Sequence, residues 1–189
     1  MQSIIQSEFL EHIKISNLSI DSIISSIETA AKICINTLQN NGKILIFGNG
    51  GSAADAQHIA AELVGRYKTE RKGVPEIALT TDTSILTSIS NDFGYDFIFE
   101  RQVQSLANRG DTIIGISTSG ASPNVINALK IASILGCNSI GFSGEYRKEM
   151  DHTCDINISI PSSDTPRIQE MHILVGHIIC HLIDQELKP

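Results

Sequence analysis

The sequence lacks the features that direct a chain to a membrane or to nucleic acid. Its apolar runs stay below the ~18–20 residues that a membrane helix requires. The N-terminal stretch MQSIIQSEFLEHIK has acidic residues and no basic region before them, so we expect no signal peptide and a cytoplasmic location. The formal net charge is −7, whereas binding DNA or RNA through its phosphates requires a surplus of Lys and Arg. The negative net charge does not exclude binding of a small anionic ligand, because a helix N-terminus binds phosphate without lysine.

The sequence also lacks a C-x-x-C pair. Its four cysteines are Cys34, Cys137, Cys154 and Cys180. A zinc knuckle requires tighter spacing. We therefore expect small buried or half-buried thiols in a reducing compartment.

The length of 189 residues suits a single domain. We expect residues 1–189 to form one domain, with residues 1–40 as an N-terminal helical extension. Apolar residues recur there at three- and four-residue spacing, which predicts two helices that end at Asn41-Gly42. Their apolar share is high for an outer extension, so they must pack on something, and another subunit is one candidate.

Short apolar strands alternate with helices from residue 43 onward. We expect strands at 43–47, 76–79, 112–117, 139–142 and 156–160, and helices at 52–64, 83–89, 95–107, 123–135 and 165–187. Strands that are apolar throughout indicate a parallel sheet covered on both faces, here a three-layer α/β sandwich with five strands. Ligands bind such sheets beyond the carboxyl ends of the strands.

A glycine-rich loop follows the first of these strands. Residues 48–53, GNGGSA, contain G-x-G-x-x-A, which alone is a weak dinucleotide signal. A dinucleotide site also requires an acidic residue at the end of the second strand, about 20 residues on, and here that strand ends later, at Thr80-Thr81-Asp82. The G-K-[ST] ending of a P-loop is missing as well. The loop therefore favours a different phosphate ligand.

A hydroxyl-rich loop follows the third strand. Ser117, Thr118, Ser119 and Ser122 stand immediately before a helix whose first residue is Pro123. Hydroxyls together with the free N–H groups of a helix N-terminus form a compact anion site. Helix capping explains Ser122 alone, so the other three hydroxyls favour a phosphate site.

Two polar pairs lie on the helices that flank these loops. His58 and Glu62 are four residues apart and share one helix face, as a metal-binding pair or as an ordinary exposed pair. Gln169 and His177 are eight residues apart, about 12 Å of helix rise. That spacing permits a shared metal without requiring one, and His181 with His177 forms a rival H-x-x-x-H pair.

Five segments together resemble one known family. They are GNGGSAADAQHIAAEL, LTTDTS, SNDFG, GISTSGASPNV and TPRIQEMHILVGH. The chain is similar over nearly its whole length to the sugar isomerase (SIS) domains, and within them to the phosphoheptose isomerases. The hydroxyl loop is common to all SIS domains, while H-x-x-x-E and RIQEMH are specific to the heptose branch.

The resemblance implies an SIS fold, of the flavodoxin-like type, and a set of roles. Glu62 and His177 become the acid–base pair, and His58, Glu62, Gln169 and His177 become the ligands of one Zn²⁺ per subunit. The implied substrate contacts are Asn49, Gly50, Gly51, Ser52, Glu62, Asn91, Asp92, Ser117, Thr118, Ser119, Ser122 and Gln169. The implied partners are a sugar phosphate and three further copies of the chain, in a homotetramer with sites between subunits.

The implied reaction converts sedoheptulose 7-phosphate into D-glycero-D-manno-heptose 7-phosphate, the first step towards ADP- or GDP-heptose for lipopolysaccharide, capsule or S-layer glycan. An aldose–ketose isomerisation requires a base near two carbons, stabilisation of an enediol oxygen, and a remote phosphate grip. Our hypothesis is that Glu62 moves the carbon-bound proton and His177 the oxygen-bound ones. Because zinc lowers the pKa of a bound carboxylate, Glu62 can serve both tasks only through a loose or exchanging bond.

Other side chains have open roles. Arg66 either contacts the substrate or a neighbouring subunit or is simply solvated, and Arg167 is a candidate for a contact with a carboxylate or sugar. We interpret His172 and His181 as polar-face or interface residues. Asp92 is either a sugar contact or a turn former beside Gly94.

Two alternatives from other functional classes compete with the isomerase. Some SIS modules only bind phosphosugars as sensors, and one kind that resembles this family binds a replication initiator protein, but such modules do not require the His/Glu/Gln/His set. Other SIS enzymes include lyases of etherified amino sugars and pentose-phosphate isomerases, and the RIQEMH segment disfavours them.

Overall fold

A parallel sheet forms the centre of the protein. The computed structural model describes residues 1–147 and 149–188. Within them the five strands lie in the order β2-β1-β3-β4-β5, all parallel. Their bounds are β1 Ile44–Gly48, β2 Glu76–Ala78, β3 Thr112–Ile116, β4 Asn138–Ser143 and β5 Ile156–Ser159. The predicted three-layer α/β fold with a five-stranded parallel sheet is confirmed.

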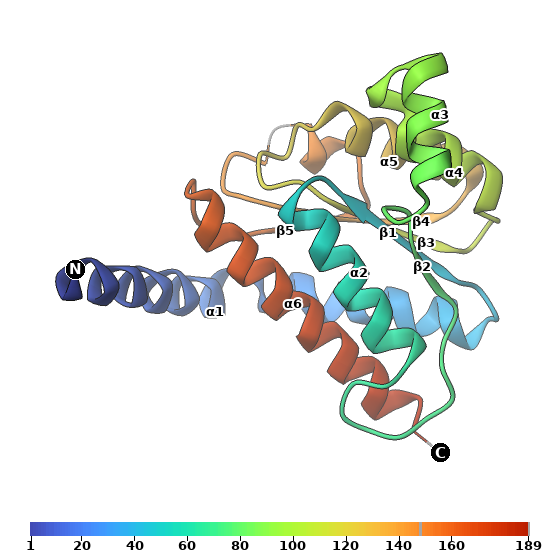
Figure 1. Ribbon diagram of the computed structural model, residues 1–189. Coiled ribbons are helices and arrows are strands. Elements are labelled where there is room, and N and C mark those ends of the chain that lie inside the picture. Colours follow the sequence, from blue (N-terminus) through green and yellow to red (C-terminus); the bar gives the residue numbers. More distant parts are fainter. Residues whose placement is uncertain (148, 189) are drawn as a thin grey trace.

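Helices cover both faces of this sheet. Those within the described residues are α1 Gln2–Gln39, α2 Gly51–Val64, α3 Thr83–Phe93, α4 Ile98–Leu106, α5 Pro123–Leu135 and α6 Thr165–Glu186, with short 3-10 turns η1 Tyr95–Phe97 and η2 Met150–His152. Figure 1 shows α1, α2 and α6 on one face and α3, α4 and α5 on the other. The helix predicted at 83–89 is α3, which extends four residues further, to Phe93.

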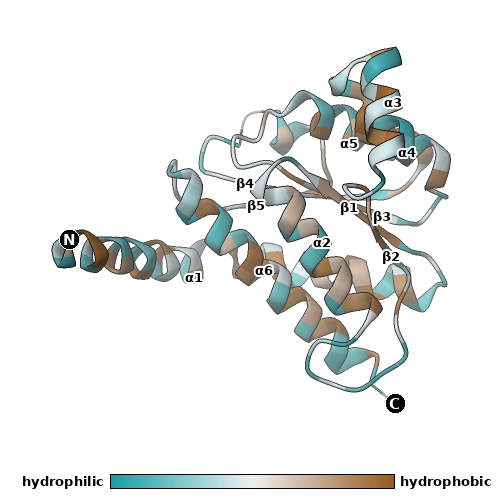
Figure 2. Cartoon of the chain, viewed as in Figure 1, coloured by the Kyte–Doolittle hydropathy of each residue, from teal (hydrophilic) through white to brown (hydrophobic). Residues whose placement is uncertain are grey.

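The strands are buried on both sides, as their continuous apolar runs predict. Ile44, Ile46 and Ile114 pack with residues of α1, α2 and α6 in one cluster. Leu45 and Phe47 point to the other face, where the Phe47 ring stacks on Phe99 of α4 at 4.9 Å between centroids. Figure 2 shows the hydrophobic strands between helices whose outer surfaces are more polar. Alternate residues of each strand thus anchor opposite helical layers.

Residues 1–40 form one helix, so the prediction of two helices is wrong. α1 runs unbroken for 38 residues. The helix does not break between Ile13 and Ile23, because Ile15 and Ser19 continue the buried face there. The hydroxyls of Ser19 and Ser22 donate back to the carbonyls of Ile15 and Leu18. The polar residues that interrupt the pattern are therefore accommodated inside the helix.

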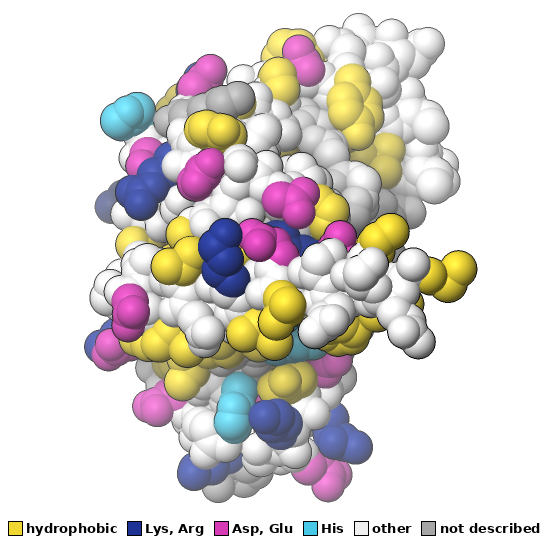
Figure 3. All heavy atoms as spheres, turned by 90° about the vertical axis from the view of Figure 1, so that its left-hand side faces the viewer, with side chains coloured by type: hydrophobic (Ala, Val, Ile, Leu, Met, Phe, Trp, Pro, Cys, Tyr) yellow, Lys and Arg dark blue, Asp and Glu magenta, His cyan; other side chains and the backbone are white. Residues whose placement is uncertain are grey.

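The first half of α1 leaves apolar side chains exposed. It projects from the body of the molecule in Figure 1, and Figure 3 shows hydrophobic side chains across the face that contains this end. The exposed residues there are Ile4, Ile5, Phe9, Leu10, Ile13, Leu18, Ile20 and Ile24. Among the residues that the structure describes, no helix is both long and apolar enough to cross a membrane.

Glu76, the first residue of β2, places a carboxyl group in the core between sheet and helices. It is 6% exposed, and in the described part of the chain neither carboxylate oxygen has a hydrogen-bond partner. Burial raises the pKa of Glu76 to about 8, while the positive charge of Arg71 opposes this shift. The folded protein therefore holds a proton on Glu76 at neutral pH.

This proton predicts a loss of stability as the pH rises. Between about pH 4.3, where an unfolded glutamate ionises, and about pH 8, the folded state binds one proton more than the unfolded state, so the free energy of unfolding falls with pH. Glu76→Gln should remove this contribution of Glu76 to the slope, which amounts to roughly 1.4 kcal/mol per pH unit. Chemical denaturation between pH 5 and 8 measures it.

The control is Glu186→Gln, at an exposed residue near the end of α6. It should keep the wild-type slope. Parallel pH profiles for wild type and Glu76→Gln would contradict the assignment of a proton to the buried carboxyl.

Candidate functional site

The glycine loop and the hydroxyl loop meet at one point of the sheet. Gly48 and Ile116, the last residues of β1 and β3, are register partners, so both loops leave the sheet side by side. β1 and β3 flank the position where the strand order reverses, which is where open α/β sheets bind ligands. The structure thus confirms that these two predicted loops share one rim.

A pair of asparagines joins the loops. Asn49 of the glycine loop and Asn124, the second residue of α5, exchange two amide hydrogen bonds of 2.9 Å. The Tyr95 hydroxyl donates to the same Asn49 oxygen at 3.0 Å. Asn124 is buried, so the N-terminus of α5 fixes the orientation of Asn49.

The hydroxyls of the second loop converge on Ser117. Its Oγ lies 2.8 Å from Ser122 Oγ and 3.3 Å from Ser119 Oγ. The Ser122 hydroxyl makes no capping bond to α5 within the described residues, so capping does not explain this serine. Pro123 has no N–H, and the Val125 and Ile126 amides donate to the Ser122 carbonyl. The Asn124 amide has no partner in the described part of the chain, and with three hydroxyls beside it this helix end forms a site suited to a phosphate.

Gly120 allows the loop to take this shape. Its φ is +66°, and a Cβ there would lie 2.5 Å from the Arg147 carbonyl oxygen. The Gly120 carbonyl accepts from the Met150 amide. A glycine is therefore required at this turn for both conformation and space.

A second cluster lies between α2 and α6. The ligand atoms of His58, Glu62 and His177 all lie within 4.8 Å of one another. His58 Nε2 is 3.3 Å from Glu62 Oε1 and 3.5 Å from His177 Nε2. The Glu62 side chain is 25% exposed and that of His58 50%, so the cluster opens to solvent.

Close contact between the two helices makes this cluster possible. A Cβ at Gly176 would overlap the side chain of Ile59, so α6 approaches α2 at the residues next to His177 and His58. Two histidines and a glutamate match the three-ligand set of catalytic zinc sites, which keep a fourth position for water or substrate. The residues present therefore fit a zinc ion.

Gln169 and Ser52 lie near the glycine loop. A Cβ at Gly51 would lie 2.6 Å from Gln169 Nε2, so the Gln169 amide rests against this loop. Ser52 is buried at the start of α2, whereas Gly50, with φ +55°, is exposed. The predicted roles of Gln169 as ligand and of these loop residues as substrate contacts stay predictions.

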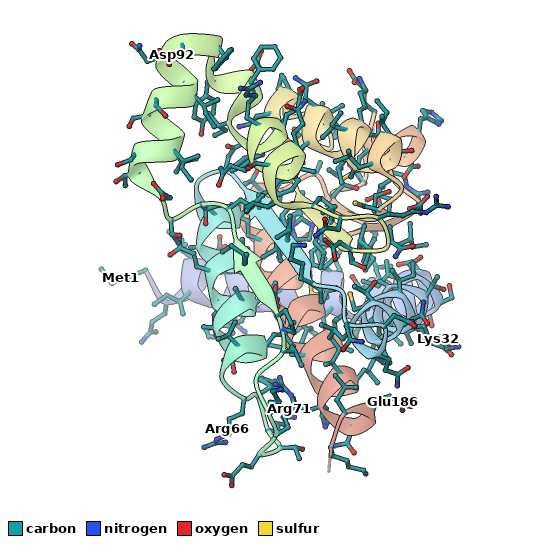
Figure 4. The ribbon with its side chains drawn as sticks, turned by 90° about the vertical axis from the view of Figure 1, so that its right-hand side faces the viewer. Met1, Lys32, Arg66, Arg71, Asp92 and Glu186 are labelled. Atoms are coloured by element: carbon teal, nitrogen blue, oxygen red, sulfur yellow. The ribbon has the colours of Figure 1, made fainter. Side chains whose placement is uncertain are left out.

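Asn91 and Asp92 stand apart from the other predicted site residues. Both are exposed on α3, where the Asn91 amide donates to Asp92 at 2.8 Å. Figure 4 shows Asp92 at the outer end of α3. The single chain does not bring them to the rim, so their substrate contact stays a prediction.

His172 corrects our interpretation of a polar-face or interface residue. It is 0% exposed, packs against the Phe142 ring, and its Nε2 lies 3.1 Å from the Ser143 carbonyl oxygen. Burial lowers the pKa of His172 to about 4, so the neutral ring donates to that carbonyl. His172 is a core residue, which the apolar periodicity of its helix did not reveal. His181, by contrast, is half-buried and lies near the Tyr67 ring.

The two arginines have opposite environments. Arg66 is exposed and points away from the body in Figure 4. Arg167 is buried and contacts the carboxylates of Glu8 and Glu170 at 3.3 and 2.7 Å, and it donates to the Glu8 carbonyl. The expected carboxylate contact of Arg167 is thus within the chain, where it joins α1 to α6.

The cysteines are free thiols, as predicted. Cys34, Cys137 and Cys180 are buried and Cys154 is half-buried. Burial raises the pKa of Cys34 and Cys180 and raises that of Cys154 to about 12. These thiols stay protonated and are unsuited to nucleophilic chemistry.

Three residues at the site escaped the sequence-based prediction. Asn124 and Tyr95 orient Asn49, and the Tyr67 ring stacks on His177 with centroids 5.3 Å apart and planes 18° apart. Their partners are distant in sequence, so no local spacing reveals them.

Comparison with known proteins agrees with this geometry. The sequence profile of the SIS domain matches residues 9–144. The chain is 60% identical to the phosphoheptose isomerase of Aliarcobacter butzleri over the full length of both proteins. Among solved structures it is similar to the phosphoheptose isomerase of Neisseria gonorrhoeae, with 41% identity and a TM-score of 0.93, covering 97% of this chain and 98% of that one. The Francisella tularensis enzyme gives 34% identity and a TM-score of 0.94, with the same coverage.

The hydroxyl loop yields a prediction about anion binding. Ser117→Ala removes the hydroxyl on which the loop converges, so the dissociation constant for inorganic phosphate should rise about tenfold or more, the cost of one hydrogen bond to a charged group. Isothermal titration calorimetry measures it. Ser105→Ala, at an exposed serine of α4, should bind like wild type, and equal affinities for all three proteins would place the anion elsewhere.

Proposed function

The chain belongs to the SIS-domain family, as an isomerase of the phosphoheptose isomerase branch, and from this premise we propose that it interconverts sedoheptulose 7-phosphate and D-glycero-D-manno-heptose 7-phosphate. The observation that carries this proposal is the presence, on one side of the sheet edge, of a hydroxyl loop before α5 and of a His/Glu/His cluster between α2 and α6. A sugar phosphate carries both features that such a site recognises, a dianion at one end and a carbonyl at the other.

The loop at the N-terminus of α5 would hold the substrate phosphate. Ser117, Ser119 and Ser122, with Thr118 and the Asn124 amide of the helix, would supply the donors. Asn49 and the glycine loop would contact the sugar, since the Asn49–Asn124 pair ties them to the same helix end. Binding energy from the phosphate would orient the distant carbonyl end.

Glu62 and His177 would move the protons. Glu62 takes the carbon-bound proton from one carbon and returns it to its neighbour through an enediol, and His177 moves protons on the two oxygens. The two side chains face each other across α2 and α6 and are half-buried, so they are accessible and yet held by packing. Tyr67, stacked on His177, limits the rotation of that ring.

His58, Glu62 and His177, with Gln169 as a fourth candidate, would hold one zinc ion. Bound there, the ion would supply a Lewis acid that stabilises negative charge on the substrate oxygens. Asp55 lies one turn before His58, and one of its oxygens is buried without a partner in the described part of the chain. Burial raises the pKa of Asp55, while the charge of His58 opposes the rise. The three-residue spacing on α2 would bring the Asp55 carboxyl near His58, the candidate metal ligand.

The proposed setting is a cytoplasmic homotetramer. Free buried thiols suit a reducing compartment. Exposed apolar residues of α1, together with Leu174 and Ile178 of α6, suit burial against further copies of the chain. In such an assembly a neighbouring subunit could bring residues such as Asn91 and Asp92 to the rim. The product would enter ADP- or GDP-heptose synthesis for lipopolysaccharide, capsule or S-layer glycan.

The decisive assay incubates purified protein with sedoheptulose 7-phosphate, with and without a chelator. NMR should reveal aldose product, and the rate should fall after chelation and recover with added zinc. Absence of product under every metal condition would contradict the proposed isomerase activity and favour a module that only binds phosphosugars.

Glu62→Gln tests the identity of the base. An amide cannot accept the carbon-bound proton, so kcat should fall by roughly 10²–10⁴ while the fold is kept. Glu70→Gln, at an exposed loop residue, is the matched control and should be unaffected. Near-normal turnover of Glu62→Gln would remove Glu62 from this role.

A further inference from the structure

A buried ion pair lies at the far end of the helix contact that forms the His/Glu/His cluster. Arg71 follows α2, and its Nε donates to Asp184 Oδ1 of α6 at 2.6 Å. The two side chains are 1% and 0% exposed. Figure 4 shows Arg71 turned towards α6, whereas Arg66, only five residues earlier, points outward.

This pair joins three segments of the chain. Asp184 Oδ2 also accepts the amides of Lys68 and Thr69, at 2.7 and 2.9 Å. Arg71 in turn donates to the carbonyls of Leu63 at 2.9 Å and Glu62 at 3.3 Å, the last turn of α2. The ion pair therefore fastens the end of α2 and the loop after it to α6.

One of the groups that this ion pair holds, the Glu62 carbonyl, belongs to a residue of the cluster. Glu62 supplies both a carbonyl to Arg71 and a side chain to the cluster. Asp184 is seven residues after His177, two helical turns or about 10 Å along the same face of α6. Burial alone would raise the pKa of Asp184, but the Thr69 and Lys68 amides and Arg71 hold it below its usual range, so the carboxylate stays charged.

Tyr67 connects the anchored loop to the cluster, because it precedes the loop residues that bind Asp184 and its ring contacts His177. The next two residues, Lys68 and Thr69, are the ones whose amides bind Asp184. The Tyr67 ring stacks on His177, and the Lys68 ammonium lies 5.3 Å from the centroid of the same ring. Movement of the loop would therefore change the support of the His177 ring.

We propose that Arg71, Asp184 and Tyr67 form a positioning clamp, which holds α2 and α6 at the spacing and His177 in the orientation that let His58, Glu62 and His177 bind one divalent ion. None of the three residues is one of the candidate metal ligands, which are His58, Glu62 and His177. Its role rests on the metal site of the proposed function. Groups that orient metal ligands from outside typically change metal affinity 10- to 100-fold when they are removed.

Stability and positioning can be separated at this pair. Replacing one partner leaves a buried charge unpaired and destabilises the fold, whereas replacing both by apolar residues of similar volume is often neutral. The double variant Arg71→Met/Asp184→Leu should keep a melting temperature close to wild type while it loses the anchoring of the loop. The matched control, Glu28→Gln/Lys32→Met, removes an exposed ion pair on α1.

The experiment measures Zn²⁺ affinity by competition with a chromogenic chelator and records the visible spectrum of the Co²⁺-loaded protein. The double variant should bind Zn²⁺ roughly 10- to 100-fold more weakly and show an altered Co²⁺ spectrum, while the control should match wild type. Tyr67→Leu should weaken binding in the same direction, and Tyr67→Phe, which keeps the ring, should restore it.

Each outcome decides between the two proposals. Equal Zn²⁺ affinity and equal Co²⁺ spectra in wild type, Tyr67→Leu and the double variant would overturn the clamp and leave the metal site standing. If the double variant does not fold, the Zn²⁺ affinities of Tyr67→Leu and Tyr67→Phe test the clamp by themselves. A wild-type protein that binds neither ion would overturn the metal site and the clamp's role with it, whatever the isomerase assay gives.

Discussion

The contact between α2 and α6 is the constraint on which the chemistry of this protein depends. Gly176 leaves no room for a side chain against Ile59, so the helices approach at the residues beside His58 and His177. Two histidines that are 119 residues apart in the chain, together with a glutamate, thus lie within reach of one ion. The Arg71–Asp184 pair lies two turns further on along α6 and ties the same two helices. Packing at one end and an ion pair at the other leave the cluster little freedom.

The sheet provides the second fixed element, because it sets where the anion loop lies relative to that cluster. β1 continues directly into the glycine loop and α2, while β3 continues into the hydroxyl loop and α5. The register pairing of Gly48 with Ile116 and the hydrogen bonds between Asn49 and Asn124 hold the two loops side by side at the same edge of the sheet. In the proposed function, the site would therefore separate a phosphate grip at the start of α5 from a reactive end between α2 and α6. Such a division suits an isomerase, whose remote binding energy orients the reacting carbons.

Local sequence patterns predicted the parts of this structure that depend on local physics. Apolar strands alternating with helices predicted the sheet and its two covered faces. The hydroxyl loop before Pro123 lies at the carboxyl end of a strand, as expected, while its role as an anion site stays a prediction. The single helix α1 was missed because the face that it buries between Ile13 and Ile23 includes a serine, Ser19, and so departs from a purely apolar spacing. His172 was misassigned because a histidine on an apolar helix face carries no sign of the Ser143 carbonyl that receives it. Asn124, Tyr67 and the Arg71–Asp184 pair depend on tertiary contacts across 75 to 113 residues or on ring stacking, for which the chain order holds no signal.

The most direct measurement of the central claim, that α2 and α6 together form a metal-binding catalytic centre beside the phosphate loop, is a crystal structure of the protein with zinc and inorganic phosphate, with data collected across the zinc absorption edge. The account predicts an anomalous peak in contact with His58, Glu62 and His177, and phosphate density at Ser117, Ser119 and Ser122 at the N-terminus of α5. An anomalous peak at other residues, or none at the cluster with zinc in excess, would contradict it.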